Sequence, residues 1–97
     1  MSVDSNSIKK RKKIVFRLEA PTANEVYVAG EFNNWSLKKH PMQKNGDGAW
    51  KKALLLPPGA YEYKFWVDGQ WCQDPDNERC CKNSFGSINN IVQISMR

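Results

Sequence analysis

The sequence predicts an all-β fold, an antiparallel β-sandwich formed by a single domain. Short stretches that alternate apolar and polar residues recur along the 97-residue chain, and turn signals rich in glycine and proline separate them. No window repeats its apolar residues with the 3.6-residue period of a helix of ordinary length. A chain of this length has room for one hydrophobic core, so we expect the strands to pack around it as two sheets.

The first strand is predicted for residues 14–19. Ile14, Phe16 and Leu18 fall on one face of it, as in a strand with one buried side. A break at residues 20–24, which contains a proline, ends the strand.

The second strand is predicted for residues 25–32, because three β-forming residues follow one another at 26–28. Gly30 either ends this strand or marks a bulge. A polar loop is then expected over residues 32–44, and the Asn-Gly-Asp-Gly sequence at 45–48 predicts a tight turn.

The third strand is predicted for residues 49–56, with Trp50, Leu54 and Leu56 on its core side. Because Trp50 shares a face with leucines, we expect it to belong to the core. The Pro-Pro-Gly sequence at residues 57–59 stops this strand.

The fourth strand is predicted for residues 61–67, where alternation is cleanest. Its polar face carries Glu62, Lys64 and Trp66, while aromatic and apolar residues face the other way. The Asp-Gly pair at 68–69 is typical of a type I′ hairpin turn, so the chain should double back toward Trp71.

The last strand is predicted for residues 87–96, after a polar loop at 73–84. Ile88, Val92 and Ile94 are expected to point inward, and Asn90 lies in the same register.

The net charge of +5 arises largely from one basic run, residues 9–13, and the remainder is nearly neutral. Such a run is usually a solvated tail or a strand edge, so binding of nucleic acid or of an acidic membrane is the less favoured reading. We assign residues 1–11 to a disordered basic tail and residues 12–97 to the folded domain.

The cysteines and the N-terminus indicate a cytoplasmic protein. Cys72, Cys80 and Cys81 are odd in number and two are adjacent, which does not resemble a disulfide framework. We find neither a secretory signal nor a stretch of membrane-helix length. Three unevenly spaced cysteines and His40, expected to lie in a surface loop, are too few for a zinc site, and we predict no metal or cofactor.

The sequence predicts no catalytic residues. The ten acidic residues are scattered, and Asp74 and Asp76 flank a proline in a pattern typical of a turn rather than of a catalytic pair. Nucleophile elbows, phosphate-binding glycine loops and His-Glu metal motifs are all missing.

Exposed tryptophans point instead to sugar binding. One face of a pyranose ring carries C–H bonds and its rim carries hydroxyls, so it suits a flat indole with polar groups beside it. Trp35 lies in a polar run, Trp71 follows the hairpin, and Lys64 lies on the polar strand face before it. We expect the two rings to share one wet surface with this lysine; the alternative is that they cover one end of the core. Trp66 either supports this site or simply covers the sheet.

Three separated motifs resemble a known family. Residues 25–35, 63–71 and 89–93 are similar, in this order, to the glycogen-binding domain of AMP-activated protein kinase β subunits. That domain belongs to carbohydrate-binding module family 48, related to the N-terminal domains of isoamylases and branching enzymes. The resemblance extends over residues 15–94, and it implies an immunoglobulin-like sandwich that binds α-1,4-glucans.

The resemblance also implies individual roles. Trp35 and Trp71 match the family's stacking platforms, Lys64 matches a lysine that bonds sugar hydroxyls, and Asn89 matches an asparagine that bonds the sugar. Two further site positions depart from kinase members of the family, which often carry a leucine and a threonine there. This chain has Phe85, which is larger and flat, and Ser87, which keeps the hydroxyl.

The predicted function is thus a non-catalytic module that binds glycogen, starch or maltooligosaccharides and targets an associated glucan-processing enzyme or kinase to them. The main alternative is a protein-interaction module of the same fold that lacks sugar binding. A nucleic-acid binder that uses the basic run is a second alternative, and it predicts steep salt dependence.

Overall fold

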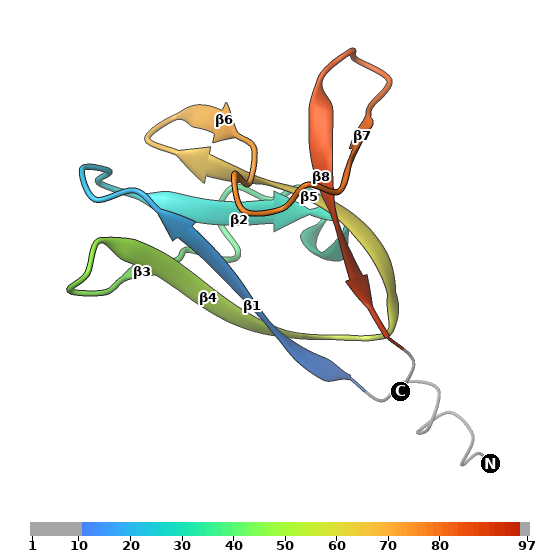
Figure 1. Cartoon of the computed structure of the whole chain (residues 1–97), viewed down its shortest axis with the longest axis horizontal. Coiled ribbons are helices and arrows are strands. Elements are labelled where there is room, and N and C mark those ends of the chain that lie inside the picture. Colours follow the sequence, from blue (N-terminus) through green and yellow to red (C-terminus); the bar gives the residue numbers. More distant parts are fainter. Residues whose placement is uncertain (1–10, 96–97) are drawn as a thin grey trace.

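A computed structural model describes residues 11–95, which form two antiparallel sheets packed face to face (Figure 1). This confirms the predicted all-β, immunoglobulin-like sandwich. The basic tail predicted for residues 1–11 lies almost entirely outside the described residues. Arg11 is described, and its guanidinium donates a hydrogen bond of 3.1 Å to the carbonyl oxygen of Leu55. The predicted boundary at residue 12 stays a prediction.

The first sheet has three strands in the order β1-β4-β3. They are β1 (Lys12–Glu19), β4 (Ala49–Leu56) and β3 (Gln43–Lys44). The alternation predicted from the sequence is confirmed in β1, where Phe16 and Leu18 are buried and their neighbours are exposed. This sheet forms the lower layer at the left of Figure 1.

The second sheet has five strands, with β2-β5-β8-β7 in order and β6 paired to β5. They are β2 (Val26–Gly30), β5 (Gly59–Val67), β6 (Gln70–Cys72), β7 (Cys80–Lys82) and β8 (Ile88–Ile94). β5 is central: one half of it pairs with β8, and the half near the hairpin pairs with β6. The outward side chains of β5 therefore have neighbouring strands on both sides.

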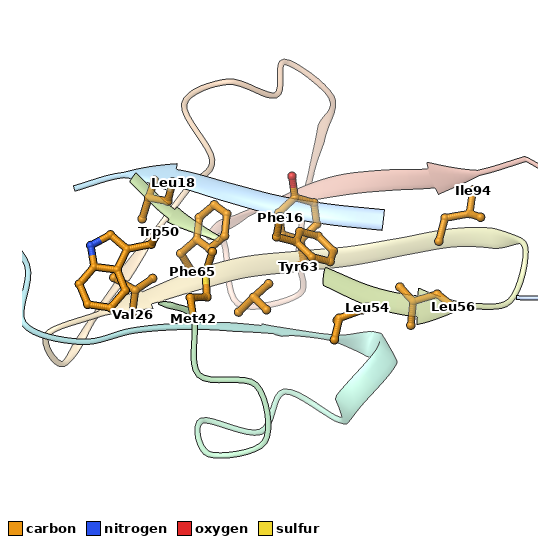
Figure 2. Packing of buried hydrophobic residues seen from close by; sticks show 11 residues of the cluster. Phe16, Leu18, Val26, Met42, Trp50, Leu54, Leu56, Tyr63, Phe65 and Ile94 are labelled. Atoms are coloured by element: carbon orange, nitrogen blue, oxygen red, sulfur yellow. The ribbon is translucent and has the colours of Figure 1, made fainter. Parts of the chain in front are cut away.

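The core lies between the inner faces of the sheets (Figure 2). Trp50 is 7% exposed, as predicted, and its indole nitrogen donates to the carbonyl oxygen of Ala20 at 2.9 Å. The rings of Phe16 and Tyr63 meet edge to face across the sheets, with centroids 5.0 Å apart. The buried cluster comprises Phe16, Leu18, Val26, Val28, Met42, Trp50, Leu54, Leu56, Tyr63, Phe65 and Ile94.

A buried polar cluster attaches the loop between β6 and β7 to the core. Asn90 is 1% exposed, and its side-chain oxygen accepts from the backbone nitrogen of Asp74 at 2.6 Å. The Tyr63 hydroxyl donates to the Asp74 carboxylate and accepts from the amide of Asn77. Burial raises the pKa of Tyr63, so its hydroxyl keeps its proton. The inward register predicted for Asn90 is confirmed, and its polar side chain binds the backbone of this loop.

Two short strands lie where the sequence predicted only loops: β3 falls within the predicted loop 32–44, and β7 falls within the predicted loop 73–84. A 3-10 turn, η1 (Glu31–Asn33), follows β2 and takes up the end of the strand predicted for residues 25–32. Two or three residues are too few to show an alternation, so these strands exist because longer neighbours offer hydrogen-bond partners.

Candidate functional site

The outer face of the five-stranded sheet is hollowed between the β2–β3 connection and the β7–β8 hairpin. This hollow has a volume of about 690 Å³, which falls in the range of small-molecule sites. All six residues predicted for the site line it. The full lining is Glu31, Trp35, Glu62, Lys64, Trp71, Lys82, Asn83, Ser84, Phe85, Ser87 and Asn89.

The backbone around Trp35 is unusual. Asn34 and Trp35 both have positive φ, 56° and 59°, the left-handed region that bulky side chains rarely occupy. The backbone nitrogen of Trp35 donates to the carbonyl oxygen of Gly30 at 2.9 Å, which closes the turn. This conformation brings a half-buried indole to the rim of the hollow.

Asn33 holds this turn from beneath. It is 5% exposed, and its side-chain oxygen accepts from the backbone nitrogens of Gly30 and Ser36. Its side-chain nitrogen donates to the carbonyl oxygen of Val28 and contacts Nδ1 of His40 at 2.8 Å. Because an amide nitrogen only donates, Nδ1 of His40 accepts and carries no proton.

His40 lies in a loop, as the sequence suggested, and it is also a structural partner of Asn33. Its imidazole is half-buried, and its carbonyl oxygen accepts from the backbone nitrogen of Val28. Burial lowers the pKa of His40, and the nearby charges of Lys52 and Lys39 lower it further. All these effects favour the neutral ring that the bond from Asn33 requires.

Trp71 is presented by the predicted hairpin. Asp68 and Gly69 both have positive φ, 47° and 85°, as a type I′ turn requires. Trp71 pairs directly across the strands with Trp66, and their ring centroids are 4.8 Å apart at 71°. Trp71 is 45% exposed, whereas its cross-strand neighbour Trp66 is half-buried. Of the two roles considered for Trp66, the geometry favours support of Trp71.

The indoles of Trp35 and Trp71 lie side by side, with centroids 6.2 Å apart and planes 80° apart. The sequence placed both rings on a shared surface, and the structure brings them together. Their nearly perpendicular arrangement gave no signal in the sequence, because it depends on the left-handed turn at Trp35 and on the packing of Trp66. The pair forms a corner rather than a flat platform.

Lys64 lies beside this corner. Its ammonium nitrogen is 6.0 Å from the centroid of the Trp71 ring, within reach of a cation–π contact. The same nitrogen donates to the hydroxyl oxygen of Ser87 at 3.0 Å. Lys64 therefore connects the aromatic corner to the β7–β8 hairpin.

Asn83 organises the tip of that hairpin. Its side-chain oxygen accepts from the backbone nitrogens of Phe85 and Ser87, and its side-chain nitrogen donates to the Ser87 hydroxyl at 2.8 Å and to Oδ1 of Asn89 at 3.3 Å. Phe85 stands at the tip with 93% of its surface exposed. The sequence analysis missed Asn83, because its role depends on a turn that brings four polar groups around one amide.

Asn89 lies on the floor of the hollow rather than at its surface. It is 5% exposed, and its side-chain nitrogen donates to Oε1 of Glu62 at 2.9 Å. Together with the bond from Asn83, this satisfies both ends of the amide with protein partners. Glu62 also lines the hollow, and the sequence could have identified it, because strand alternation places it on the outward face of β5 with Lys64 and Trp66.

The charges around the hollow are mixed. Lys64 and Lys82 contribute two cations, and Glu31 and Glu62 contribute two carboxylates. Cys81 lies close to these acids. Burial raises the pKa of the Cys81 thiol, and a hydrogen bond to Glu62 and the nearby carboxylate charges raise it further, so the thiol is disfavoured as a nucleophile.

The described residues offer no metal centre. Within residues 11–95, no group of three His, Cys, Asp or Glu side chains is arranged to hold an ion, and Cys72, Cys80 and Cys81 are free thiols. No helix in this part of the chain has the length and apolar character needed to span a membrane.

Comparison with known proteins gives a consistent result. A family model described as the glycogen recognition site of AMP-activated protein kinase matches residues 13–97. The 5'-AMP-activated protein kinase subunit beta-1 of Rattus norvegicus is 37% identical over 94 residues, which cover 97% of this chain and 33% of that protein. The corresponding protein of Sus scrofa is also 37% identical over 94 residues, and the match covers 73% of it. Subunit beta-2 of Mus musculus is 41% identical over 70 residues, 72% of this chain and 25% of that protein. The chain thus spans about a third of the length of the rat relative.

Proposed function

Because this chain belongs to the family of glycogen-recognition domains of AMP-activated protein kinase, we propose that it is a non-catalytic module that binds α-1,4-linked glucans in the hollow of its five-stranded sheet. Membership confirms the resemblance inferred from the three sequence motifs. The ligands we propose are glycogen, starch and maltooligosaccharides, held by Trp35, Lys64, Trp71, Phe85 and Ser87, with Asn89 on the floor of the site.

The observation that carries the proposal is the corner formed by Trp35 and Trp71. α-1,4 linkages make a glucan chain curve, so consecutive glucose rings present their apolar faces in different directions. Two indoles at 80° suit such a chain, whereas a flat β-1,4-linked chain requires nearly coplanar platforms. We therefore propose selectivity for α-glucans over cellulose.

Polar groups beside the corner complete the site. Lys64 and Ser87 are hydrogen-bonded to one another, and each keeps further capacity to bond sugar hydroxyls. Phe85 is so exposed that it offers a third apolar surface at the hairpin tip. Asn89 acts from the floor, where it orients Glu62 and accepts from Asn83.

The affinity of one site should be modest. Each aromatic contact contributes about 1 kcal/mol, and ordering the ligand opposes binding, so we expect dissociation constants of roughly micromolar to millimolar. A branched polymer presents many equivalent segments, and avidity then raises the apparent affinity.

We also propose that the module targets an associated protein to glucans. The relatives are subunits of a protein kinase, and the chain covers about a third of the rat one. A kinase or a glucan-processing enzyme is the partner class that this suggests. Cytoplasmic localisation stays a prediction from the cysteine pattern.

Replacement of the indoles tests the proposal. We expect Trp35→Ala and Trp71→Ala each to weaken maltoheptaose binding by about tenfold or more, measured by calorimetry. Val15→Ala removes an exposed apolar side chain from the other sheet and should leave binding unchanged. Wild-type affinity in both tryptophan variants would contradict the proposed site.

Glycogen co-sedimentation separates this function from the alternative of a protein-interaction module. A glucan binder sediments with glycogen, and a module that has lost sugar binding stays in the supernatant. Binding that weakens steeply as salt rises would instead favour recognition of nucleic acid through the basic run.

A further inference from the structure

The hollow has an acidic end that the proposed stacking site does not use. Trp66, Lys64 and Glu62 follow one another along the outward face of β5, and Trp71 is paired to Trp66 at one end. At roughly 3.3 Å per residue, Glu62 lies about 13 Å along the strand from Trp66. Glu31 follows the last β2 residue paired with β5, so it meets Glu62 at this far end.

Each carboxylate is held in place by the protein. Oε1 of Glu31 accepts from the backbone nitrogen of Glu62 at 2.8 Å, and Oε1 of Glu62 accepts from the side-chain nitrogen of Asn89 at 2.9 Å. The thiol of Cys81 is a further partner of Glu62. A carboxylate has about four acceptor positions, and both groups line the hollow, so each keeps acceptor positions beyond those that these partners use.

Neither carboxylate is neutralised by an ion pair. Within residues 11–95, the single salt bridge joins Arg17 to Asp76, on other elements. Lys64 lines the same hollow, but its ammonium bonds Ser87 and lies against Trp71. Two anchored, unpaired carboxylates in one hollow suit hydroxyl donors, because hydrogen bonds to charged acceptors are stronger than neutral ones.

We propose that Glu31 and Glu62 form an acceptor subsite for the hydroxyls of a glucose unit beyond those that stack on Trp35 and Trp71. This inference rests on the proposed function and specifies it further: the site is longer than its aromatic corner. The two acids determine how much affinity the module gains from a longer chain.

The test compares two ligand lengths, maltotriose and maltoheptaose, by NMR titration and calorimetry. Glu31→Gln and Glu62→Gln keep the size of each side chain and the Oε1 acceptor that the protein uses. Glu19→Gln is the matched control, since it removes the same charge from an exposed position on the other sheet. Binding of maltotriose should be the same in all three variants as in the wild type.

For maltoheptaose, we expect Glu62→Gln and Glu31→Gln to lose roughly three- to tenfold in affinity, as befits the loss of a charged acceptor. Glu19→Gln should stay within about twofold of the wild type. Unchanged affinity for maltoheptaose in both site variants overturns the inference, and so does an equal loss for both ligands, which would indicate a merely structural role.

The outcome also separates this inference from the proposed function. If the wild type binds neither ligand, or if Trp35→Ala and Trp71→Ala bind as the wild type does, the glucan site itself is wrong. If the tryptophan variants fail with both ligands while the glutamate variants bind normally, only the acceptor subsite is wrong.

Discussion

At the scale of single residues, Asn33 links the backbone of one turn to the position of a binding residue. Its amide accepts from two backbone nitrogens and donates to Val28 and His40, so the left-handed turn at Trp35 has a fixed base. The sequence predicted Trp35 from the polar run around it, but it gave no reason to pair Asn33 with a histidine seven residues later. That pairing depends on how the loop folds back under the turn.

The neutral state of His40 leads to a pH prediction. Its pKa is lowered in the folded protein, mainly by burial, from a value of 6.5 in the absence of structure. At pH values between these two pKa values, the unfolded chain binds more protons than the folded protein. The contribution of His40 to folding stability is therefore fully present above about pH 6.5 and decreases as the pH falls below that value. Urea unfolding at pH 7.5 and 5.5 measures the change.

His40→Gln is the control for this experiment, since glutamine offers an acceptor to Asn33 but does not titrate in this range. The wild type should lose more stability than this variant between the two pH values. An equal loss in both proteins would show that other groups cause the pH dependence.

At the scale of elements, the β7–β8 hairpin and the β2–β5 contact decide the shape of the site. The sequence predicted β5 and its hairpin well, because clean alternation and an Asp-Gly turn define both. It missed β7, which has three residues and is held by β8 rather than by its own pattern. Consequently Phe85 and Ser87 were assigned to the site through family resemblance alone. The hydrogen bonds by which Asn83 holds them could not be predicted from the sequence.

The role of Asn83 predicts a selective defect. Asn83→Asp keeps the oxygen that accepts from Phe85 and Ser87, but it removes the donor to the Ser87 hydroxyl and sets a carboxylate against Oδ1 of Asn89. We expect maltoheptaose affinity to fall several-fold while the melting temperature changes by only a few degrees. Affinity within about twofold of the wild type, by calorimetry, would contradict this role.

The close approach of β2 and β5 at Gly30 leads to a prediction about stability. A Cβ atom on Gly30 would lie 2.5 Å from the carbonyl oxygen of Glu62 and 2.8 Å from Cβ of Tyr63. Gly30→Ala must therefore push the strands apart, and it should cost about 1–3 kcal/mol in urea unfolding. Gly46→Ala, where nothing lies within 4 Å of the added atom, should be neutral or slightly stabilising. Equal stability of the two variants would contradict the close approach.

At the scale of the whole molecule, the two sheets have different tasks. The three-stranded sheet buries Trp50 and covers the core, and the five-stranded sheet turns its outer face into the proposed glucan site. Composition and periodicity were sufficient to predict this sandwich and to place Trp50 in its core, but they left open whether Trp35 and Trp71 cover one end of the core or share an outer surface. They could not predict the angle between the indoles of Trp35 and Trp71 or the acidic end of the hollow, since both arise where distant segments meet.

The most direct test of the glucan site uses the four indole N–H signals of the protein as internal probes. In a nitrogen-15 NMR titration with maltoheptaose, we expect the signals of Trp35 and Trp71 to shift with a common dissociation constant. The signal of Trp50 should stay in place, because its nitrogen is bonded to Ala20 inside the sandwich. Stationary signals for Trp35 and Trp71 at saturating ligand would contradict the account.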